Sequence, residues 1–367
     1  MSAARFGIVF LPESLARFGE LCAEAEERGF EWIGVADSQS VFRELYVALT
    51  VAALRTRRSH LGPLVTNPLT RHLVVTASAI SSVDELAGGR ARLGLGSGDS
   101  AIYTIGAPPT TLAGLEDSIL TVRRLTAGET VEREGRTWRV HRSVRRVPIY
   151  LAAEGPRTLE LAGRVADGVI VGLGLTPEVI ALSLAALERG ARMAGRSVDD
   201  VDVWWFAKTS LADHRDEAIK PIKMALAASA NHAFRFTLEG KGVPLDLYER
   251  IRALQREYNA HHHELPGAAN ASLPDRWGLT EFLVDRFAIA GTPGECIAQI
   301  QRAMAAGARQ FIITGFVPDP SAFMRRWARE NYVPEGRREK TWHPVIHDEM
   351  TKKDLDLSGR PSYASIA

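Results

Sequence analysis

The 367-residue sequence has few cysteines, no long apolar run and no excess of either charge. Two cysteines, Cys22 and Cys296, are too few for a disulfide framework or a cysteine-based zinc site, which favours a reducing compartment. The 45 basic and 44 acidic side chains nearly cancel, which excludes a general nucleic-acid-binding surface as the main theme. The longest uncharged stretch, residues 100–115, contains two prolines and two glycines, so no membrane span is expected.

The apolar segment near the N-terminus is short. An apolar run of only seven residues, 6–12, follows Arg5 and stops at Glu13. That length suits a strand and its exit rather than a signal peptide. We therefore expect a cytoplasmic protein that acts on a small molecule, with neither a nucleic-acid nor a membrane partner.

Short apolar runs alternate with amphipathic stretches along most of the chain, a pattern typical of βα units. Eight strands are predicted, at residues 6–10, 32–36, 61–65, 92–95, 148–152, 168–171, 201–206 and 309–313. Strands that are apolar throughout indicate a parallel sheet covered on both faces. Eight such units most simply close into an α/β fold of the (β/α)8 TIM-barrel type, and a doubly wound open sheet is the alternative.

Three segments depart from this alternation. Residues 130–140 are predicted to form a β-hairpin excursion around Gly135. Residues from about 208 to 285 show helical patterns without a clear strand, and we interpret them as an insertion after the seventh strand. Residues 1–333 would then form one barrel domain, and the polar, non-periodic tail 334–367 would be either disordered or an arm that packs on a partner.

Several side chains admit more than one interpretation. On the seventh strand, one ring of the Trp204–Trp205 pair is expected inside the barrel and the other between barrel and helices. In the helix that begins after Thr292, Ile297, Ile300 and Met304 are predicted to face inward. Aromatic and histidine side chains of the insertion could line a substrate pocket or only pack its helices: Phe234, Phe236, Tyr248, Tyr258 and His261, His262, His263. Three consecutive histidines cannot all face one point, so no metal site is predicted.

Active sites of (β/α)8 barrels lie at the carboxyl ends of the strands. Polar or glycine-rich segments follow most of the predicted strands, and they could equally be helix caps and tight turns. Arg157 is the sharpest of these signals, because a cation in the first turn of a helix is otherwise disfavoured. Two interpretations stay open for it: a residue beside a phosphate at the helix N-terminus, or a surface charge.

Several blocks of residues together resemble the bacterial luciferase-like superfamily. Within it, they are most similar to the methylenetetrahydromethanopterin reductase branch. The blocks are residues 66–72 (TNPLTRH), 84–90 (DELAGGR), 93–99 (LGLGSGD), 148–157 (PIYLAAEGPR) and 291–295 (GTPGE). The resemblance implies a (β/α)8 barrel with an insertion after strand seven, and FMN or a deazaflavin bound at the mouth of the barrel.

The resemblance also implies roles for individual residues. Asp37 would lie near the ring system, and Leu64 and Val65 would back it, at a place where the family often has a non-proline cis peptide. Asn67, Gly98 and Asp99 would contact the ring or its side chain. The phosphate would be held by Glu154, Gly155, Pro156, Arg157, Gly172 and Leu173. The candidates for handling protons are Asp37, His72 and Asp99.

Three functions remain open from the sequence. The first is an FMN-dependent monooxygenase supplied with reduced flavin by a separate reductase, since no nicotinamide fingerprint is visible. The second is a reductase or dehydrogenase that transfers a hydride with the deazaflavin coenzyme F420. The third is a barrel that binds a flavin without catalysis, and a metal-dependent hydrolase is a more remote alternative. By analogy with the family, a homo-oligomer, either dimer or tetramer, is expected.

Overall fold

The computed structural model divides the chain into two compact units, Met1–Phe316 and Val317–Ala367. It describes residues 3–12, 14–133, 135–259, 269–316, 325, 328–329, 331–338, 342 and 344–357.

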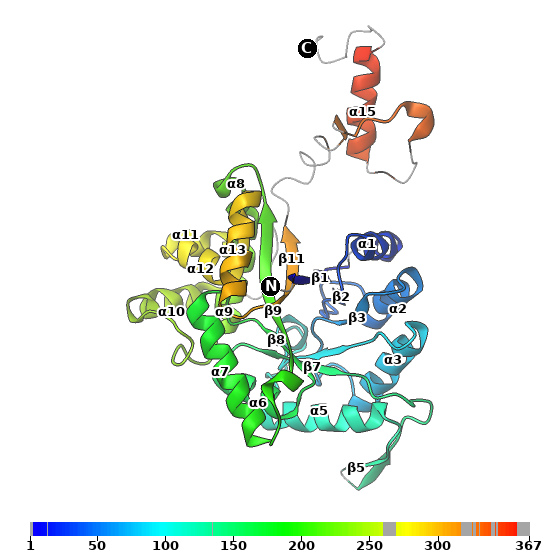
Figure 1. The fold of residues 1–367 in the computed structure, drawn as a ribbon, viewed down its shortest axis with the longest axis vertical. Coiled ribbons are helices and arrows are strands. Elements are labelled where there is room, and N and C mark those ends of the chain that lie inside the picture. Colours follow the sequence, from blue (N-terminus) through cyan, green and yellow to red (C-terminus); the bar gives the residue numbers. More distant parts are fainter. Residues whose placement is uncertain are drawn as a thin grey trace. The chain divides into compact units, whose positions relative to one another are not determined.

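The first unit is a parallel β-barrel (Figure 1). Its eight barrel strands are β1 (Arg5–Phe10), β2 (Trp32–Val35), β3 (His60–Pro63), β4 (Leu93–Leu95), β7 (Ile149–Ala153), β8 (Gly168–Val171), β9 (Asp202–Leu211) and β11 (Gln310–Phe316). They pair in the order β3-β2-β1-β11-β9-β8-β7-β4. Parallel bridges from Leu61 to Ala91 and from Thr66 to Leu95 join β3 to β4 and close the ring. The predicted (β/α)8 barrel is confirmed.

The region of the seventh strand differs from the prediction. β9 runs to Leu211, beyond the predicted end at Phe206, and its last four residues pair with an additional strand, β10 (Ala288–Gly291). β10 was not predicted, because four small and apolar residues between two helical patterns carry no alternation that separates a strand from a buried turn. Together β9 and β10 form a platform that carries the insertion.

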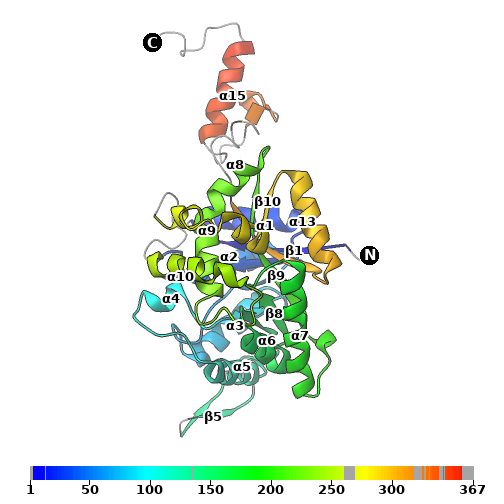
Figure 2. The same ribbon diagram turned by 90° about the vertical axis from the view of Figure 1, so that its left-hand side faces the viewer.

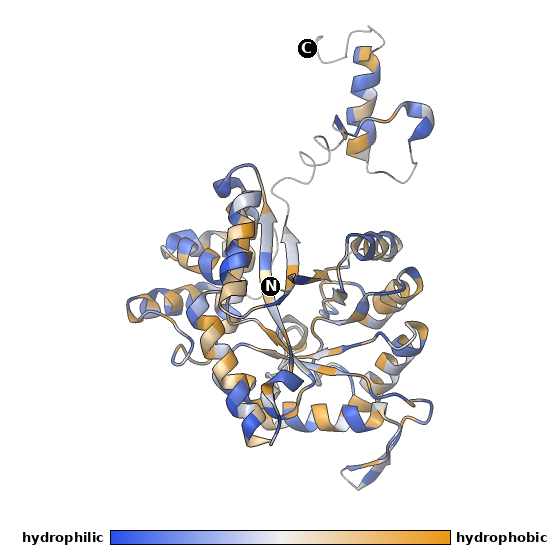
Figure 3. Cartoon of the chain, in the orientation of Figure 1, coloured by the Kyte–Doolittle hydropathy of each residue, from blue (hydrophilic) through white to orange (hydrophobic). Residues whose placement is uncertain are grey.

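Helices pack around the barrel. They are α1 (Leu15–Glu27), α2 (Leu45–Arg55), α3 (Leu73–Leu86), α5 (Leu112–Thr126), α6 (Pro156–Val165), α7 (Pro177–Met193) and α13 (Pro293–Ala305), with the short α4 (Ser100–Tyr103) after β4. Hydrophobic and hydrophilic residues alternate along these helices (Figure 3). Their buried faces and the outward side chains of the strands form the largest apolar core. This layer fixes the strand ends from which the site is built.

The barrel interior is filled by side chains that include Val9, Leu64, Ile170, Trp204 and Ile312. Trp204 lies inside the barrel and Trp205 lies in the layer between strands and helices, as predicted. At the amino-terminal end, the carboxylate of Asp202 accepts hydrogen bonds from the Tyr150 hydroxyl at 2.7 Å and from Trp204 Nε1 at 3.0 Å. The apolar side chains and the hydrogen bonds of Asp202 fill the barrel interior, so a ligand can bind only at the other end, where the strands have their carboxyl ends.

The insertion forms a small helical body with its own apolar core. It contains α8 (Arg215–Ile219), α9 (Lys223–Ala233), α10 (Tyr248–Glu257), α11 (Leu273–Arg276) and α12 (Thr280–Phe287), together with the 3₁₀ turns Lys220–Ile222, Leu245–Leu247 and Ala269–Ser272. Figure 2 shows α9, α10 and α4 on the same side of the barrel. The guanidinium of Arg235, just past α9, donates a 2.5 Å hydrogen bond to the Tyr103 hydroxyl of α4. This contact joins the insertion to the loop after β4.

Two local predictions have different outcomes. The hairpin is confirmed as β5 (Val131–Arg133) paired with β6 (Arg136–Trp138). The inner face of α13 was predicted incorrectly at Ile297, which is 56% exposed, whereas Cys296 and Ala303 are buried. Ile300 and Met304 pack partly buried against the core. The capping box of Thr292 and Glu295 sets where the helix begins and hence which face turns inward.

The second unit contains the 3₁₀ turn Glu335–Arg337 and the helix α15 (Pro344–Leu357). The guanidinium of Arg338 pairs with the carboxylate of Asp354 at 2.5 Å. Asp354 also accepts a hydrogen bond from the Tyr332 hydroxyl. The tail was predicted without periodic structure, and α15 departs from that prediction because its apolar residues are not gathered on one face.

Candidate functional site

A cavity of about 630 Å³ opens at the carboxyl ends of the barrel strands. The strand ends supply one part of its wall and α9, with the segment that follows it, supplies another. The predicted site residues on this wall are Asp37, Leu64, Val65, Asn67, Gly98, Asp99, Glu154, Gly155, Pro156, Arg157 and Gly172. Segments far apart in the sequence thus converge on one space, as barrel topology requires.

Two predicted site residues do not reach the cavity wall. His72 is exposed, and its Nδ1 accepts the Val74 backbone N–H at the start of α3, while its ring contacts Trp138 edge-on. Leu173 is buried, and its carbonyl accepts a 3.0 Å hydrogen bond from Arg286 Nε. In this structure His72 caps a helix and Leu173 anchors an arginine of α12.

The floor of the cavity is apolar and smooth. The Leu64–Val65 peptide is cis, which places the unusual bond where the resemblance puts it. Gly96 comes so close to this segment that a Cβ on it would lie 3.0 Å from Val65 Cγ2. A Cβ on Gly172 would lie 2.6 Å from a carboxylate oxygen of Glu154. Glycine at both positions lets the two backbones stay close to their neighbours and keeps the floor open.

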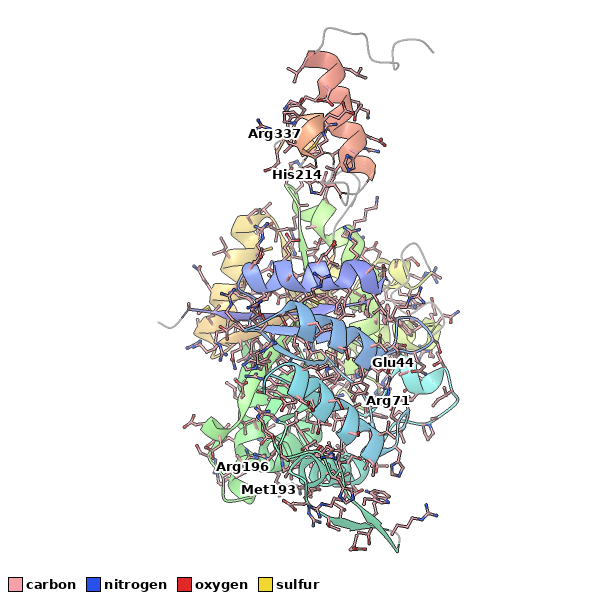
Figure 4. The ribbon with its side chains drawn as sticks, turned by 90° about the vertical axis from the view of Figure 1, so that its right-hand side faces the viewer. Glu44, Arg71, Met193, Arg196, His214 and Arg337 are labelled. Carbon is pink, nitrogen blue, oxygen red and sulfur yellow. The ribbon has the colours of Figure 1, made fainter. Side chains whose placement is uncertain are left out.

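Asp37 ends the segment after β2 and is committed to an ion pair. Its carboxylate accepts two hydrogen bonds from Arg71, at 2.6 and 3.1 Å, and a third from the Thr66 hydroxyl at 2.5 Å. Arg71 also reaches Glu44 at 2.8 Å, and Figure 4 labels these two neighbours. Burial opposes the charge of Arg71, but the bonds to Asp37 and Glu44 outweigh it and raise the pKa of the guanidinium. Asp37 is thus held in one orientation at the cavity wall.

The N-terminus of α6 forms a second feature of the wall. Gly155 occupies the N-cap without a side chain to satisfy the helix, and Pro156 fills the first helical position. No acidic residue lies in the first turn, which carries Arg157 and Thr158, and both line the cavity. The positive end of the helix dipole and a cation at one place favour an anionic ligand such as a phosphate.

A cluster of charged side chains forms the third feature. The imidazole of His232, in the last turn of α9, has Nδ1 3.1 Å from an oxygen of Asp99 and Nε2 2.7 Å from an oxygen of Glu154. Burial lowers the pKa of His232, but the two carboxylates outweigh burial and raise it to about 10. Glu154 was predicted beside the phosphate, whereas the structure directs its carboxylate to this histidine.

Two further cations of the insertion reach the same cluster. Arg235 lies 4.0 Å from Asp99 and donates a 3.3 Å hydrogen bond to the Ser97 hydroxyl. The buried ammonium of Lys241 donates a 2.6 Å hydrogen bond to the carbonyl of Ala233 at the end of α9. Burial lowers the pKa of Lys241 to about 8, opposed by Glu154 and reinforced by Arg286. Sequence reasoning missed His232, Arg235 and Lys241, because only tertiary packing brings α9 and the segment after it to the strand ends.

The aromatic candidates of the insertion separate into two groups. Phe236 lines the cavity and is 72% exposed. Phe234 is buried in the core of the insertion, and Tyr248 and Tyr258 pack against that core. The three histidines, His261–His263, lie outside the described residues. Among the residues that are described, no group of three or more histidine, cysteine or acidic side chains is arranged to hold a metal ion.

Comparison with known proteins adds a family to this geometry. The family model for luciferase-like monooxygenases matches residues 3–310. The chain belongs to this family. The expectations of a luciferase-like fold and of a luciferase-like oxidoreductase are therefore confirmed. Within the part of the chain that the structure describes, no helix combines the length and apolar character needed to cross a membrane.

Relatives within the family cover most of the chain. A 5,10-methylenetetrahydromethanopterin reductase of Methanopyrus kandleri is 30% identical over 85% of this chain and 93% of its own length. An F420-dependent glucose-6-phosphate dehydrogenase of Microbacterium testaceum is 29% identical over 90% and 94%. The solved structure of the coenzyme F420-dependent tetrahydromethanopterin reductase of Methanopyrus kandleri matches with a TM-score of 0.69 and 27% identity, over 87% of this chain and 95% of that one.

Proposed function

We propose that the chain is an oxidoreductase that uses the deazaflavin coenzyme F420 to exchange a hydride with a small organic substrate. The cavity carries this proposal, because it joins an apolar floor, a bare helix N-terminus and a carboxylate cluster in one space. The choice of coenzyme F420 over FMN is supported by the relatives, since the Microbacterium dehydrogenase and the Methanopyrus structure are both named as F420-dependent.

The residues present fit such a coenzyme. The hydroxyls of Thr110 and Thr314 line the cavity, are buried, and have no hydrogen-bond partner among the described residues, so a polar ligand would satisfy them. Leu64 and Val65 offer an apolar surface to one face of a flat ring system. The first turn of α6, with Gly155, Arg157 and Thr158, would hold a phosphate.

When bound, a deazaflavin supplies or accepts a hydride, and the protein binds, orients and shields the reactants. Asp37, oriented by Arg71, would hold the polar edge of the ring in one orientation. Asp99, which lines the same cavity, would hold or accept the proton of the substrate. The insertion, through α9 and the segment that follows, would exclude water from the reacting atoms.

FMN-dependent monooxygenation was the first hypothesis from the sequence, and none of the three relatives described above is named for it. The separate flavin reductase belongs to that hypothesis alone. The homo-oligomer stays a prediction, and one surface suits it: α2 and α3 contact each other and expose Val47, Leu54, Val75 and Leu86.

Turnover with and without oxygen tests the proposal against its alternatives. The purified chain would be incubated with oxidised coenzyme F420 and a panel of alcohols, and with the reduced coenzyme and a panel of carbonyl and unsaturated compounds. Hydride transfer predicts a change in the visible absorbance of the coenzyme at equal rates in air and under nitrogen. Substrate oxidation only with reduced FMN and oxygen would contradict it. Tight coenzyme binding with no turnover across the panels would favour the non-catalytic barrel.

A further inference from the structure

His232 occupies a place that couples three separate elements. It lies in the last turn of α9 and contacts Asp99, after β4, and Glu154, directly after β7. A neutral imidazole has one N–H and one lone pair, and that lone pair would face a carboxylate oxygen. Two carboxylates, one at each ring nitrogen, therefore select the doubly protonated ring. The carboxyl end of α9 adds a second preference for positive charge.

The other charges around the ring leave this conclusion intact. Lys241 contacts the end of α9 and Arg235 lies beside Asp99, so two cations from the insertion oppose the imidazolium. Arg157 lines the same cavity from α6. Among the described residues, only the two carboxylates contact the ring nitrogens directly, at 3.1 and 2.7 Å, and the cations bind carbonyl and hydroxyl groups as well. The close pairs dominate because electrostatic interaction falls with distance.

We propose that His232 is a positioning residue: as an imidazolium, it holds the carboxylates of Asp99 and Glu154 at the cavity mouth and ties α9 across them. This inference rests on the proposed function for its chemical meaning. In the oxidation of an alcohol, a bound oxidised deazaflavin would accept the electron pair of the substrate C–H bond as a hydride. Asp99 would take the O–H proton, and the C–O bond would become C=O. His232 keeps Asp99 ionised and aimed to receive that proton.

The charge of His232 is measurable in the cofactor-free protein. The full chain labelled with ¹⁵N-histidine contains ten histidines, and the signal lost in His232→Gln identifies this one. We expect both ring nitrogens to be protonated at pH 8, whereas a solvated histidine is neutral there. His214→Gln is the control, because His214 is exposed on the same insertion, at the N-cap of α8 (Figure 4). A neutral His232 at pH 8 overturns the proposal whether or not coenzyme F420 binds.

A second variant covers the case in which His232→Gln does not fold. Glu154→Gln leaves the histidine in place but removes one carboxylate, so the titration midpoint of His232 should fall by about one pH unit or more. Hydrogen exchange of residues 223–233 should rise in both variants and stay unchanged in His214→Gln. An unchanged midpoint, or unchanged exchange in α9, contradicts the proposed tie.

The effect on chemistry is read from a pH profile. Loss of the imidazolium should raise the pKa of Asp99, so the acid limb of kcat/KM for coenzyme F420 turnover should move up by about one pH unit in His232→Gln. His232→Arg, which keeps the charge, should restore the limb. A purely structural role predicts a lower rate without this movement. Absence of all turnover would count against the proposed function, while the histidine titration would still decide the charge of His232.

Discussion

Arg71 donates two hydrogen bonds to the carboxylate of Asp37, from Nη1 to Oδ2 at 2.6 Å and from Nη2 to Oδ1 at 3.1 Å. The Asp37 side chain is only 2% exposed, so the pair is almost removed from water. The two residues come from the loops after β2 and β3, and the Arg71 guanidinium also lies over the ring of Tyr46. This pair fixes one wall of the cavity without supplying a free acid or base.

Replacing Arg71 should therefore lower the free energy of unfolding by more than the loss of a surface ion pair does. Arg71→Met leaves Asp37 buried without its partner and should lower the free energy of unfolding by about 3–5 kcal/mol at pH 7. Urea denaturation measures this change. The double variant Asp37→Asn, Arg71→Met should recover part of it, because no buried charge remains.

A surface pair provides the comparison. Arg192 and Glu188 form an exposed i,i+4 pair on α7, and Arg192→Met should cost less than about 1 kcal/mol. An equal decrease in the free energy of unfolding for Arg71→Met and Arg192→Met would contradict a larger contribution of the buried pair.

The lowered pKa of Lys241 predicts that the stability of the folded chain depends on pH above about 8. Its pKa, lowered to about 8 by burial, lies below the value of about 10.4 of an unfolded lysine, so the unfolded chain binds more protons between these values. The charged form is penalised in the folded state below pH 8, and that penalty disappears as the pH rises toward 10. Relative to Lys241→Met, the wild type should gain stability over this range, by about 3 kcal/mol at most.

Denaturation of both proteins at pH 7, 8, 9 and 10 measures the difference. Subtracting the variant removes the titration of tyrosines and other lysines, which both proteins share. A difference that stays flat, or that falls with rising pH, would contradict the lowered pKa of Lys241.

The exposed side chains of α2 and α3 predict self-association. Replacing Leu54 and Val75 together by glutamate should convert an oligomer into a monomer, because charge cannot be buried in an apolar interface. Light scattering after size-exclusion chromatography measures the mass. Leu182→Glu is the control at an exposed leucine of α7. A wild-type chain that is monomeric at micromolar concentration would contradict the prediction.

The barrel could be predicted from the sequence because its strands are apolar on both faces and regularly separated by amphipathic helices. The same regularity located the strand ends, and so Asp37, Asp99 and Arg157 could be proposed for one site. The partners of these residues could not, because Arg71 and His232 meet them only through tertiary packing. His72, proposed as a candidate for handling protons, caps the start of α3 and is not among the residues that line the cavity. Its sequence position does not show which way its side chain points.

The insertion shows the limit most clearly. Its helices carry ordinary patterns, and nothing in the alanine-rich sequence of α9 states that its last turn lies over the ends of β4 and β7. That position follows from β10, whose four residues escaped prediction and whose pairing with β9 orients the insertion.

Binding of coenzyme F420 and of FMN to the purified chain, each followed by fluorescence titration, tests the central claim most directly. The account predicts that coenzyme F420 binds at least about tenfold more tightly than FMN, a difference of about 1.4 kcal/mol. Arg157→Ala should weaken this binding, and Arg136→Ala, an exposed arginine of the distant β5–β6 hairpin, should not. Tight binding of FMN alone would contradict the account and restore the monooxygenase hypothesis. Binding of neither by the folded chain would contradict the coenzyme site itself.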